Sequence, residues 1–262
     1  MNLLLPGIAS AYLLTFARVG TLIMLMPGLG EQMVSARLRL SLALLVSLVL
    51  FPTVRPLLSA ADGSIAGPGL IALLIGEIVI GLVLGLAVRA VLAALQIAGV
   101  VISQALGLSY AMTVDPMMGG QQVTLGNFLS LLGITLILAT DLHHLALDAI
   151  GRSYALLPPN GLPGKGLTTG LEMGEAARLA LTAVARGFTL AVQIAAPFVA
   201  FAILFNLGLG VLSRLMPQLQ VFFVAVPASI LIGMLILLAA LGIVMAVFLD
   251  DLGRYLGDFL GR

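Results

Sequence analysis

Three residues with metal-binding side chains fall on one face of an expected helix near the middle of the chain. Asp141, His144 and Asp148 are spaced by three and four residues, which could place oxygen and nitrogen ligands around a metal ion. The segment carries no HExxH signature, and no second cluster of such residues accompanies it. A helix end at a membrane interface explains the same residues without special chemistry. We therefore expect neither a metal nor a cofactor.

Two charged residues lie well inside hydrophobic runs. Arg18 lies within the run 3–26 and Glu77 within the run 70–88, and ionised groups in such segments face a bundle interior or a transport route. Glu77 could act in a proton relay, but no second titratable group lies nearby in sequence. We favour intrabundle charges, with Glu77 paired to Arg18 or to Arg89. An intramembrane enzyme would need paired acid–base or metal groups, so we do not expect an enzyme.

The elements that must position these residues are hydrophobic helices. Hydrophobic residues make up 61% of the 262 and charged residues 9%, whereas soluble domains have about 25% charged residues. The apolar residues occur in runs of about 20, the length at which a helix crosses a bilayer. The predicted fold class is all-α, a membrane-associated bundle of hydrophobic helices and helical hairpins in which some helices are broken.

The charge balance excludes several classes of partner. The net charge is +1 and the basic residues are scattered without a run, which gives no sign of a nucleic-acid footprint or a polybasic lipid patch. The chain has no cysteine and therefore no disulfide framework. A count of spans places Arg55 and Arg214 on one side of the membrane. The other side, which the positive-inside rule assigns to the cytoplasm, holds Arg37, Arg39, Arg89, Arg152, Lys165, Arg178, Arg254 and Arg262.

The longest polar connector suggests an internal boundary. It covers residues 151–170 and contains the turn-forming sequences PPNG and PGKG. We expect one subunit over residues 1–262, with an N-terminal helical part over 1–150 and a C-terminal helical hairpin part over 171–262. The N-terminal part contains a polar interruption over residues 107–122.

That interruption reads GLSYAMTVDPMMGGQQ. Asp115 and Pro116 must end a helix, because proline lacks a backbone donor and drives its predecessor out of the helical region. Gly119 and Gly120 let the backbone change shape at little cost, and three methionines supply soft side chains that repack around irregular surfaces. Non-helical backbone at membrane depth is tolerated where it is buried in protein or lines an aqueous cavity. The alternative is a solvent-side turn between two spans.

A second polar interruption follows the long hydrophobic run 180–205. It extends from Asn206 to Phe223 and reads NLGLGVLSRLMPQLQVFF. A proline and an arginine here interrupt a hydrophobic hairpin, and we expect a turn that contacts another subunit. The residues that carry this expectation are Ser213, Arg214, Pro217 and Gln218.

Together the two interruptions resemble the signatures of the FliR family of flagellar export-gate proteins, whose injectisome counterpart is called SctT. The likeness is carried by GLSYAMTVDPMMGGQ and LGVLSRLMPQLQVFF and extends over nearly the whole chain. The order of other features also fits: an N-terminal helix with the internal Arg18, a link containing ARLRL, the helix end DLHHL, the connector PPNG and a last hydrophobic hairpin. Flagellar and injectisome branches share both motifs, so the branch depends on weaker likeness such as DLHHL.

The resemblance implies a subunit of a type III protein secretion gate in the bacterial inner membrane, at the flagellar basal body. In such a gate, FliP, FliQ and FliR helices build a closed, roughly conical assembly, with FlhB around its base and FlhA below, and unfolded proteins are secreted through the pore. One copy of this subunit per gate is implied. The first interruption would form a plug beside a methionine ring of FliP, through Tyr110, Met112, Asp115, Pro116, Met117, Met118, Gly119, Gly120 and Gln121.

A secondary transporter would also use broken helices near the membrane midplane. Transporters of that kind usually show two related halves, and the two interruptions do not occupy corresponding places in two halves of this chain. The pattern therefore favours a secretion-gate subunit, with the injectisome branch as the alternative within the family.

Overall fold

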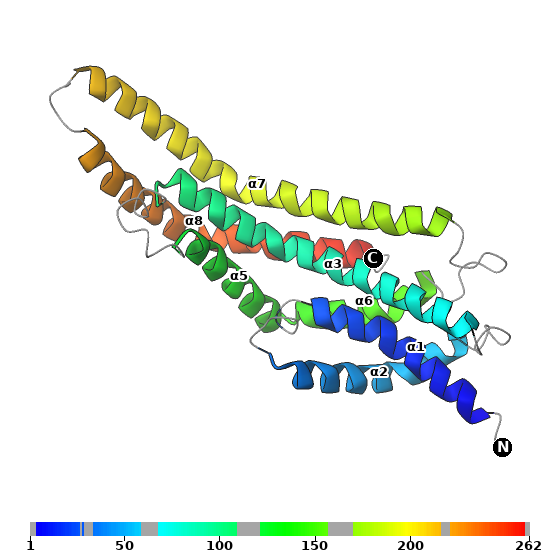
Figure 1. Ribbon diagram of the computed structural model, residues 1–262. Helices are drawn as coiled ribbons and strands as arrows, with labels where there is room; N and C mark the ends of the chain where they lie inside the picture. The colour runs from blue at the N-terminus through cyan, green and yellow to red at the C-terminus, as the bar shows by residue number, and fades with distance from the viewer. Residues whose placement is uncertain are drawn as a thin grey trace. The chain divides into compact units, whose positions relative to one another are not determined.

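The protein is described here by a computed structural model that covers residues 4–26, 28, 34–58, 68–108, 121–156, 170–215 and 221–259. These residues form α-helices and turns, with no strand among them (Figure 1). The helices are α1 (Leu4–Leu25), α2 (Ala36–Leu58), α3 (Pro68–Ala105), α5 (Gln121–Ala139), α6 (Leu142–Leu156), α7 (Gly170–Leu215) and α8 (Val221–Phe259). The prediction of an all-α fold is confirmed.

Five helices in the described part of the chain are long and apolar enough to cross a membrane. Their candidate spans are Gly7–Leu25, Ala36–Pro56, Leu70–Ala105, Ala177–Leu215 and Val224–Gly257. Helices α5 and α6 would together supply a sixth. Only Thr140 and Asp141 separate them, and Asp141 has a φ of 59°, a conformation that aspartate adopts more readily than most residues. The fold is thus a membrane-type helical bundle, as the hydropathy of the sequence predicts.

Three helices are much longer than one bilayer crossing requires. Helices α3, α7 and α8 contain 38, 46 and 39 residues, whereas about 20 suffice to span the hydrocarbon core. At about 1.5 Å per residue, the 46 residues of α7 follow a path of about 70 Å.

The C-terminal end of α3 explains where the first polar interruption begins. Gly107 has a φ of 81°, which a glycine adopts without a steric penalty. Its amide donates to the carbonyl oxygen of Gln104 at 3.1 Å, and the amide of Leu108 donates to that of Ser103 at 3.0 Å. These two bonds form a Schellman motif, which satisfies carbonyl groups that the helix end would otherwise leave without donors.

The second interruption is shorter than the sequence predicts, because α7 continues through Asn206 to Leu215. The polar side chains in this stretch bond to the helix itself. Asn206 Nδ2 donates to the carbonyl oxygen of Ala202 at 2.8 Å, and Ser213 Oγ donates to that of Gly210 at 2.9 Å. A glycine inside a helix costs only about 1 kcal/mol relative to alanine, so two glycines do not end a long apolar helix.

The described residues belong to two compact units. The first lies within Met1–Ala90, Asp141–Ala185 and Gly253–Arg262, and the second within Val91–Thr140 and Arg186–Leu252. Helices α3, α7 and α8 each contribute residues to both units. The division that the sequence predicts, at residues 151–170, stays a prediction.

In the first unit, α2 packs against α1 and α6. The ring of Tyr12 meets that of Phe51 edge to face, with the ring centroids 5.8 Å apart. The Tyr12 hydroxyl donates to the carbonyl oxygen of Leu44 at 3.1 Å, so its polar end is satisfied against α2. The buried cluster beside this contact comprises Ala11, Leu14, Val54 and Tyr154.

In the second unit, glycines allow helices to approach closely. Gly99 on α3 faces the backbone of Gly126 on α5, and a Cβ at Gly126 would lie 2.7 Å from the carbonyl oxygen of Gln96. Small residues at a helix contact allow such an approach between backbones. Near the end of α3, Ser229 Oγ of α8 donates to the carbonyl oxygen of Leu106 at 3.2 Å.

We predict that Gly126→Ala destabilises the protein, because the new methyl group would press on the backbone of α3. The free energy of unfolding should fall by roughly 1–3 kcal/mol, the usual cost of overpacking. Unfolding of the purified protein in detergent, followed by circular dichroism, measures the change.

Gly242→Ala is the matched control, since a Cβ at this helical glycine of α8 would meet nothing within 4 Å. That variant should be neutral or more stable by up to about 1 kcal/mol, because alanine favours helix. Equal effects of the two substitutions would show that the α3–α5 contact is not close-packed.

Candidate functional site

The most polar buried site of the described chain lies in the first unit, around Arg18. Arg18 lies in α1 and its side chain is 0% exposed, and Glu77 of α3 is 1% exposed. Arg18 Nε donates to Glu77 Oε2 at 2.5 Å and Arg18 Nη2 donates to Oε1 at 3.0 Å. The guanidinium and the carboxylate therefore form a bidentate ion pair, the geometry in which an arginine and a carboxylate interact most strongly.

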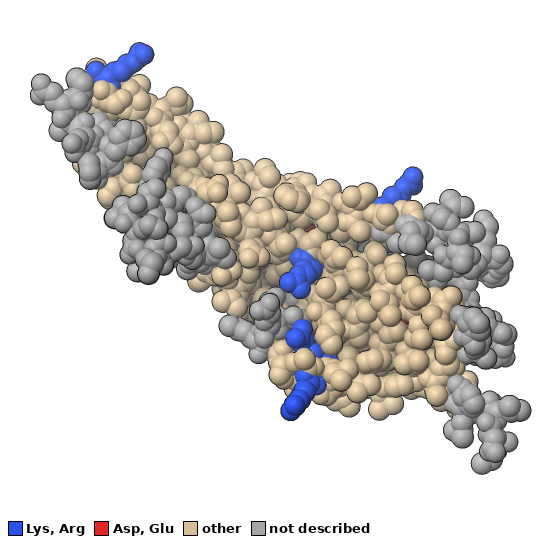
Figure 2. Space-filling model, viewed as in Figure 1, with Lys and Arg blue, Asp and Glu red and all other residues tan. Residues whose placement is uncertain are grey.

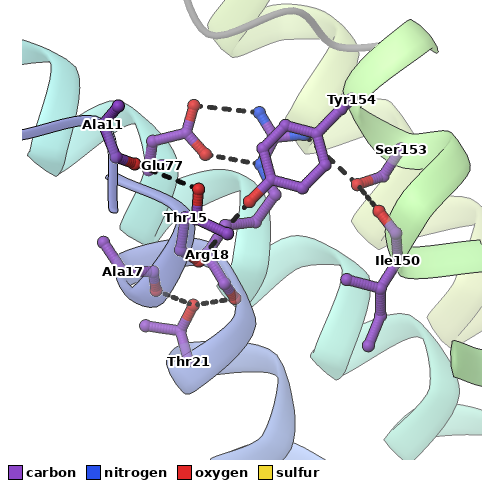
Figure 3. Close-up of polar contacts among 9 residues, drawn as sticks. All are labelled: Ala11, Thr15, Ala17, Arg18, Thr21, Glu77, Ile150, Ser153 and Tyr154. Atoms are coloured by element: carbon purple, nitrogen blue, oxygen red, sulfur yellow. Dashed lines mark hydrogen bonds and ion pairs between the residues drawn. The ribbon is translucent and has the colours of Figure 1, made fainter. Parts of the chain in front are cut away.

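Helix α6 supplies two further contacts to the guanidinium (Figure 3). Arg18 Nη1 donates to Ser153 Oγ at 3.2 Å, and Ser153 Oγ donates to the carbonyl oxygen of Ile150 at 2.7 Å. The aromatic ring of Tyr154 lies 3.9 Å from Arg18 Cζ, measured to the ring centroid. A cation over an aromatic face is stabilised most where water is excluded, and both Ser153 and Tyr154 are fully buried.

The hydroxyl group of Tyr154 joins the cluster back to α1. It donates to the carbonyl oxygen of Thr15 at 3.4 Å, and Thr15 Oγ1 donates to the carbonyl oxygen of Ala11 at 3.0 Å. The side chains around Arg18 in Figure 3 thus come from α1, α3 and α6. Their hydrogen bonds connect three helices that are far apart in sequence.

Glycine makes the close approach of α1 and α3 possible. Gly81, one helical turn after Glu77, faces the backbone of Arg18 and the side chain of Thr21, and a Cβ there would clash with both. Gly85, one turn further, faces Leu25, whose Cβ would lie 2.7 Å from an added methyl carbon. This pair of small residues lets the carboxylate of Glu77 reach the guanidinium.

The geometry favours a structural role for the buried charges over a proton relay. Both oxygens of the Glu77 carboxylate bond to the guanidinium, which also contacts the Ser153 hydroxyl group and the Tyr154 ring. A buried ion pair of this kind is strongly destabilised when one partner is removed, because the other charge is left without compensation. The arrangement can therefore hold α1, α3 and α6 together.

The residues considered as metal ligands are exposed and partnered in other ways. His144 Nε2 lies 3.9 Å from Asp141 Oδ1, and both side chains are more than two-thirds exposed. Asp148 Oδ2 instead accepts from Arg152 Nε at 3.2 Å. In the part of the chain that the structure describes, no group of three or more His, Cys, Asp or Glu could hold a metal ion.

Most residues of the two interruptions lie outside the described ranges. Of the expected plug residues, Gln121 is the first residue of α5, whereas Tyr110, Met112, Asp115, Pro116, Met117, Met118, Gly119 and Gly120 are not described. Ser213 and Arg214 are exposed in the last turn of α7. Pro217 and Gln218 lie outside the described residues.

The sequence analysis did not predict a partly buried ion pair or the two residues of α6 that contact Arg18. Arg186 of α7 donates through Nε and Nη2 to Asp251 Oδ1 of α8, at 3.1 and 2.9 Å, within the second unit. Ser153 and Tyr154 directly follow Arg152, and nothing in their spacing indicates that they face Arg18. The only sequence signal was that Arg18 and Arg186, inside apolar runs, would each need a partner.

The fold and its buried charges define a membrane-type helical bundle protein. Residues 9–255 match the family of bacterial export proteins, family 1, and the chain belongs to this family. It is 41% identical over 246 residues to the flagellar biosynthetic protein FliR of Caulobacter vibrioides. The match covers 94% of this chain and 94% of that protein. It is 30% identical over 240 residues to the flagellar biosynthetic protein FliR of Bacillus subtilis, covering 90% of this chain and 88% of that one.

A further relative carries a different name. The chain is 26% identical over 235 residues to the surface presentation of antigens protein SpaR of Salmonella typhimurium, covering 88% of this chain and 82% of that one. The family resemblance inferred from the two interruptions is thus confirmed.

We predict that Arg18→Met destabilises the protein by roughly 3–5 kcal/mol, because it leaves the Glu77 carboxylate buried without a cation. The double variant Arg18→Met, Glu77→Met should recover most of this loss, since two apolar side chains replace the pair without a remaining charge. The free energies of unfolding of the wild type, both single variants and the double variant give the coupling between the two side chains.

Additive losses in this cycle would mean that the ion pair contributes nothing to holding the helices together. Arg178→Met serves as the control, because Arg178 is exposed on α7 and its replacement should change the stability by less than about 0.5 kcal/mol.

Proposed function

We propose that this protein is a subunit of the flagellar protein export apparatus. The observation that carries the proposal is its identity of 41% to FliR of Caulobacter vibrioides over 94% of both chains. Its identity to SpaR of Salmonella typhimurium is lower, 26% over 88% of this chain. The flagellar branch is therefore favoured over the injectisome branch.

We further propose that the protein forms a closed entry pore together with FliP and FliQ homologues in the bacterial inner membrane, with FlhB and FlhA homologues beside it. Unfolded flagellar proteins would cross the membrane through this pore. Support comes from the lengths of α3, α7 and α8, which exceed what one crossing requires. The apolar side chains beyond the length of one bilayer crossing need to be buried, and helices of other subunits would bury them.

The last four turns of α7 are a part of the described chain that exposes many large apolar side chains. The large apolar side chains here are well exposed, from 57% at Ile203 and 63% at Leu207 to 74% at Leu215. The same turns end in the exposed Arg214, a charge that suits a protein neighbour better than lipid on every side. We propose that Ser213 and Arg214, with the following Pro217 and Gln218, form a turn that contacts another subunit.

We propose that the first interruption closes the pore. Met112, Met117 and Met118 would provide the seal and Gly119 with Gly120 the hinge. A loop that blocks a pore for unfolded chains must be held shut by many weak contacts and must yield when a chain arrives. Methionine side chains adapt to varied surfaces, and a pair of glycines allows the backbone to move.

We predict that this protein restores motility to a Caulobacter vibrioides strain that lacks its own FliR, and that it co-purifies there with FliP and FliQ. The reason is the family membership together with apolar helix faces that its own chain leaves exposed. Swimming in soft agar and mass spectrometry of the affinity-purified complex measure the two outcomes. A monodisperse monomer that binds a small solute would instead indicate a transporter.

We predict that deleting residues 111–120 raises ion conductance across membranes that contain the assembled gate, since the seal is removed. Conductance of the assembled complex in planar bilayers is the measurement, and co-purification of the partner subunits shows that the variant still assembles. Substituting Arg37 and Arg39 with glutamine should leave conductance at the wild-type level. Unchanged conductance in an assembled deletion variant would make the interruption an ordinary connector.

A further inference from the structure

The part of α3 that belongs to the second unit is buried except along one narrow strip. Within residues 91–105 many side chains, such as that of Ile102, are 0% exposed. The exposed residues of this part are Gln96 and Gln104. They lie eight residues apart with the partly exposed Val100 midway, so the three share one helix face over about 12 Å. Both exposed residues of this part of α3 therefore carry a carboxamide group.

This strip differs from the other exposed surfaces of the second unit. Helices α7 and α8 expose mainly aliphatic side chains there, such as Leu204 at 70% and Leu238 at 73%. The charged residues that the structure describes in this unit are Arg186, Arg214, Asp250 and Asp251. Figure 2 shows a face on which most of the described residues carry no charge. The strip on α3 is thus polar but neutral.

The two carboxamides of the strip have no hydrogen-bond partner within the described part of the chain. Each offers two donors and one acceptor, yet no hydrogen bond joins the side chain of Gln96 or Gln104 to another residue that the structure describes. Ser103, by contrast, is buried, and its Oγ donates to the carbonyl oxygen of Gly99 at 2.8 Å. An amide without a partner is costly in hydrocarbon. The strip therefore suits water or the polar groups of another molecule.

Gln104 also lines a groove between α3 and α7. The groove has a volume of about 510 Å³, which is large enough for several water molecules. Asn206 lines it from α7, and its Nδ2 donates to the carbonyl oxygen of Ala202 at 2.8 Å. The Oδ1 atom of Asn206 remains available as an acceptor. Two amide groups can thus hold water in a groove whose other walls are largely apolar.

We propose that Gln96 and Gln104 line the aqueous conduit through which the exported chain passes. This inference rests on the proposed function and adds to it the helix face of this subunit that borders the pore. Helix α3 ends in the Schellman motif at Gly107, where the interruption assigned to closing the pore begins. The last turns of α3 then lie beside the pore, and the amide strip is the face that water can reach.

Neutral amide groups suit the passage of an unfolded chain. Such a chain presents backbone N–H and C=O groups that need partners wherever water is displaced, and a carboxamide can both donate and accept. It carries no charge, so it does not retain acidic or basic segments as a lining arginine or carboxylate would. The strip can therefore admit chains of varied sequence. A polar helix of a partner subunit would satisfy the same amides but would cover the strip.

The test uses the fact that this chain contains no cysteine. The single variants Gln96→Cys and Gln104→Cys are assembled with FliP and FliQ homologues and treated with a charged, membrane-impermeant methanethiosulfonate reagent, in membrane vesicles of both orientations. We expect both variants to react at least about tenfold faster than Leu238→Cys, because the reactive thiolate forms readily in water but not in apolar surroundings. Leu238 is a matched control, since it is 73% exposed on an apolar face of the same unit.

A second measurement distinguishes the conduit from any other surface in contact with water. In the gate opened by deletion of residues 111–120, labelling at positions 96 and 104 should change the ion conductance, whereas labelling at position 238 should not. Co-purification of the partner subunits, and the conductance of the deletion variant with its native glutamines, test the proposed function separately. A deletion variant that does not conduct would contradict the plug assignment, and the labelling rates would still decide whether the strip faces water.

Two outcomes would overturn the inference. If the cysteines at positions 96 and 104 react no faster than the one at position 238 in an assembled gate, a partner subunit or lipid covers the strip. If they react quickly but leave the conductance of an open gate unchanged, the strip faces water outside the conduit.

Discussion

A guanidinium placed inside an apolar helix is costly in a bilayer, by about 2.5–3.5 kcal/mol on insertion scales, unless the protein supplies a counter-charge. Arg18 is in this position, with its side chain fully buried in α1. Its counter-charge is Glu77 of α3, and its remaining faces are covered by Ser153 and Tyr154 of α6. Removal of one partner would leave the other charge buried without compensation, so this contact ties α1 to α3 and α6. The arrangement of the first unit depends on this contact.

The ion pair in turn requires that two helix backbones come unusually close. Gly81 faces the backbone of Arg18 one turn from Glu77, and a side chain there would push α3 away from α1. In lipid, where burial of apolar groups gives little drive for helices to associate, close packing and hydrogen bonds between helices carry the association. The second unit uses the same solution, with Gly99 on α3 facing Gly126 on α5. Glycine spacing and buried polar contacts are thus two parts of one packing scheme.

The sequence predicts those features that depend on one helix at a time. Hydropathy and run length indicate a membrane-type bundle, because both are local properties of a single segment. Burial of Arg18 follows from its place in an apolar run. The sequence does not show whether Arg18 or Arg89 pairs with Glu77. Helical periodicity shows which residues share one face of a helix, but not which faces of two helices pack together. Ser153 and Tyr154 could not be found for the same reason.

The second interruption shows a different limit of sequence reasoning. Asn206, two glycines and Ser213 together suggest a break, yet the asparagine and serine side chains bond to the backbone of α7, and the helix continues to Leu215. Hydrogen bonds from such side chains to the backbone of their own helix satisfy the polar groups without ending the helix.

The α7–α8 hairpin of the second unit is constrained unequally along its length. At one end the bidentate contact between Arg186 and Asp251 fixes the register of the two helices, because a shift of one residue would separate two charges that are only partly exposed. At the other end, Ile203, Leu207 and Leu215 project from α7 without cover from this chain. A helix fixed at one end and uncovered at the other presents its free faces in a defined orientation. Such a hairpin is suited to a place among the helices of a larger assembly, where neighbouring subunits supply the contacts that one chain lacks.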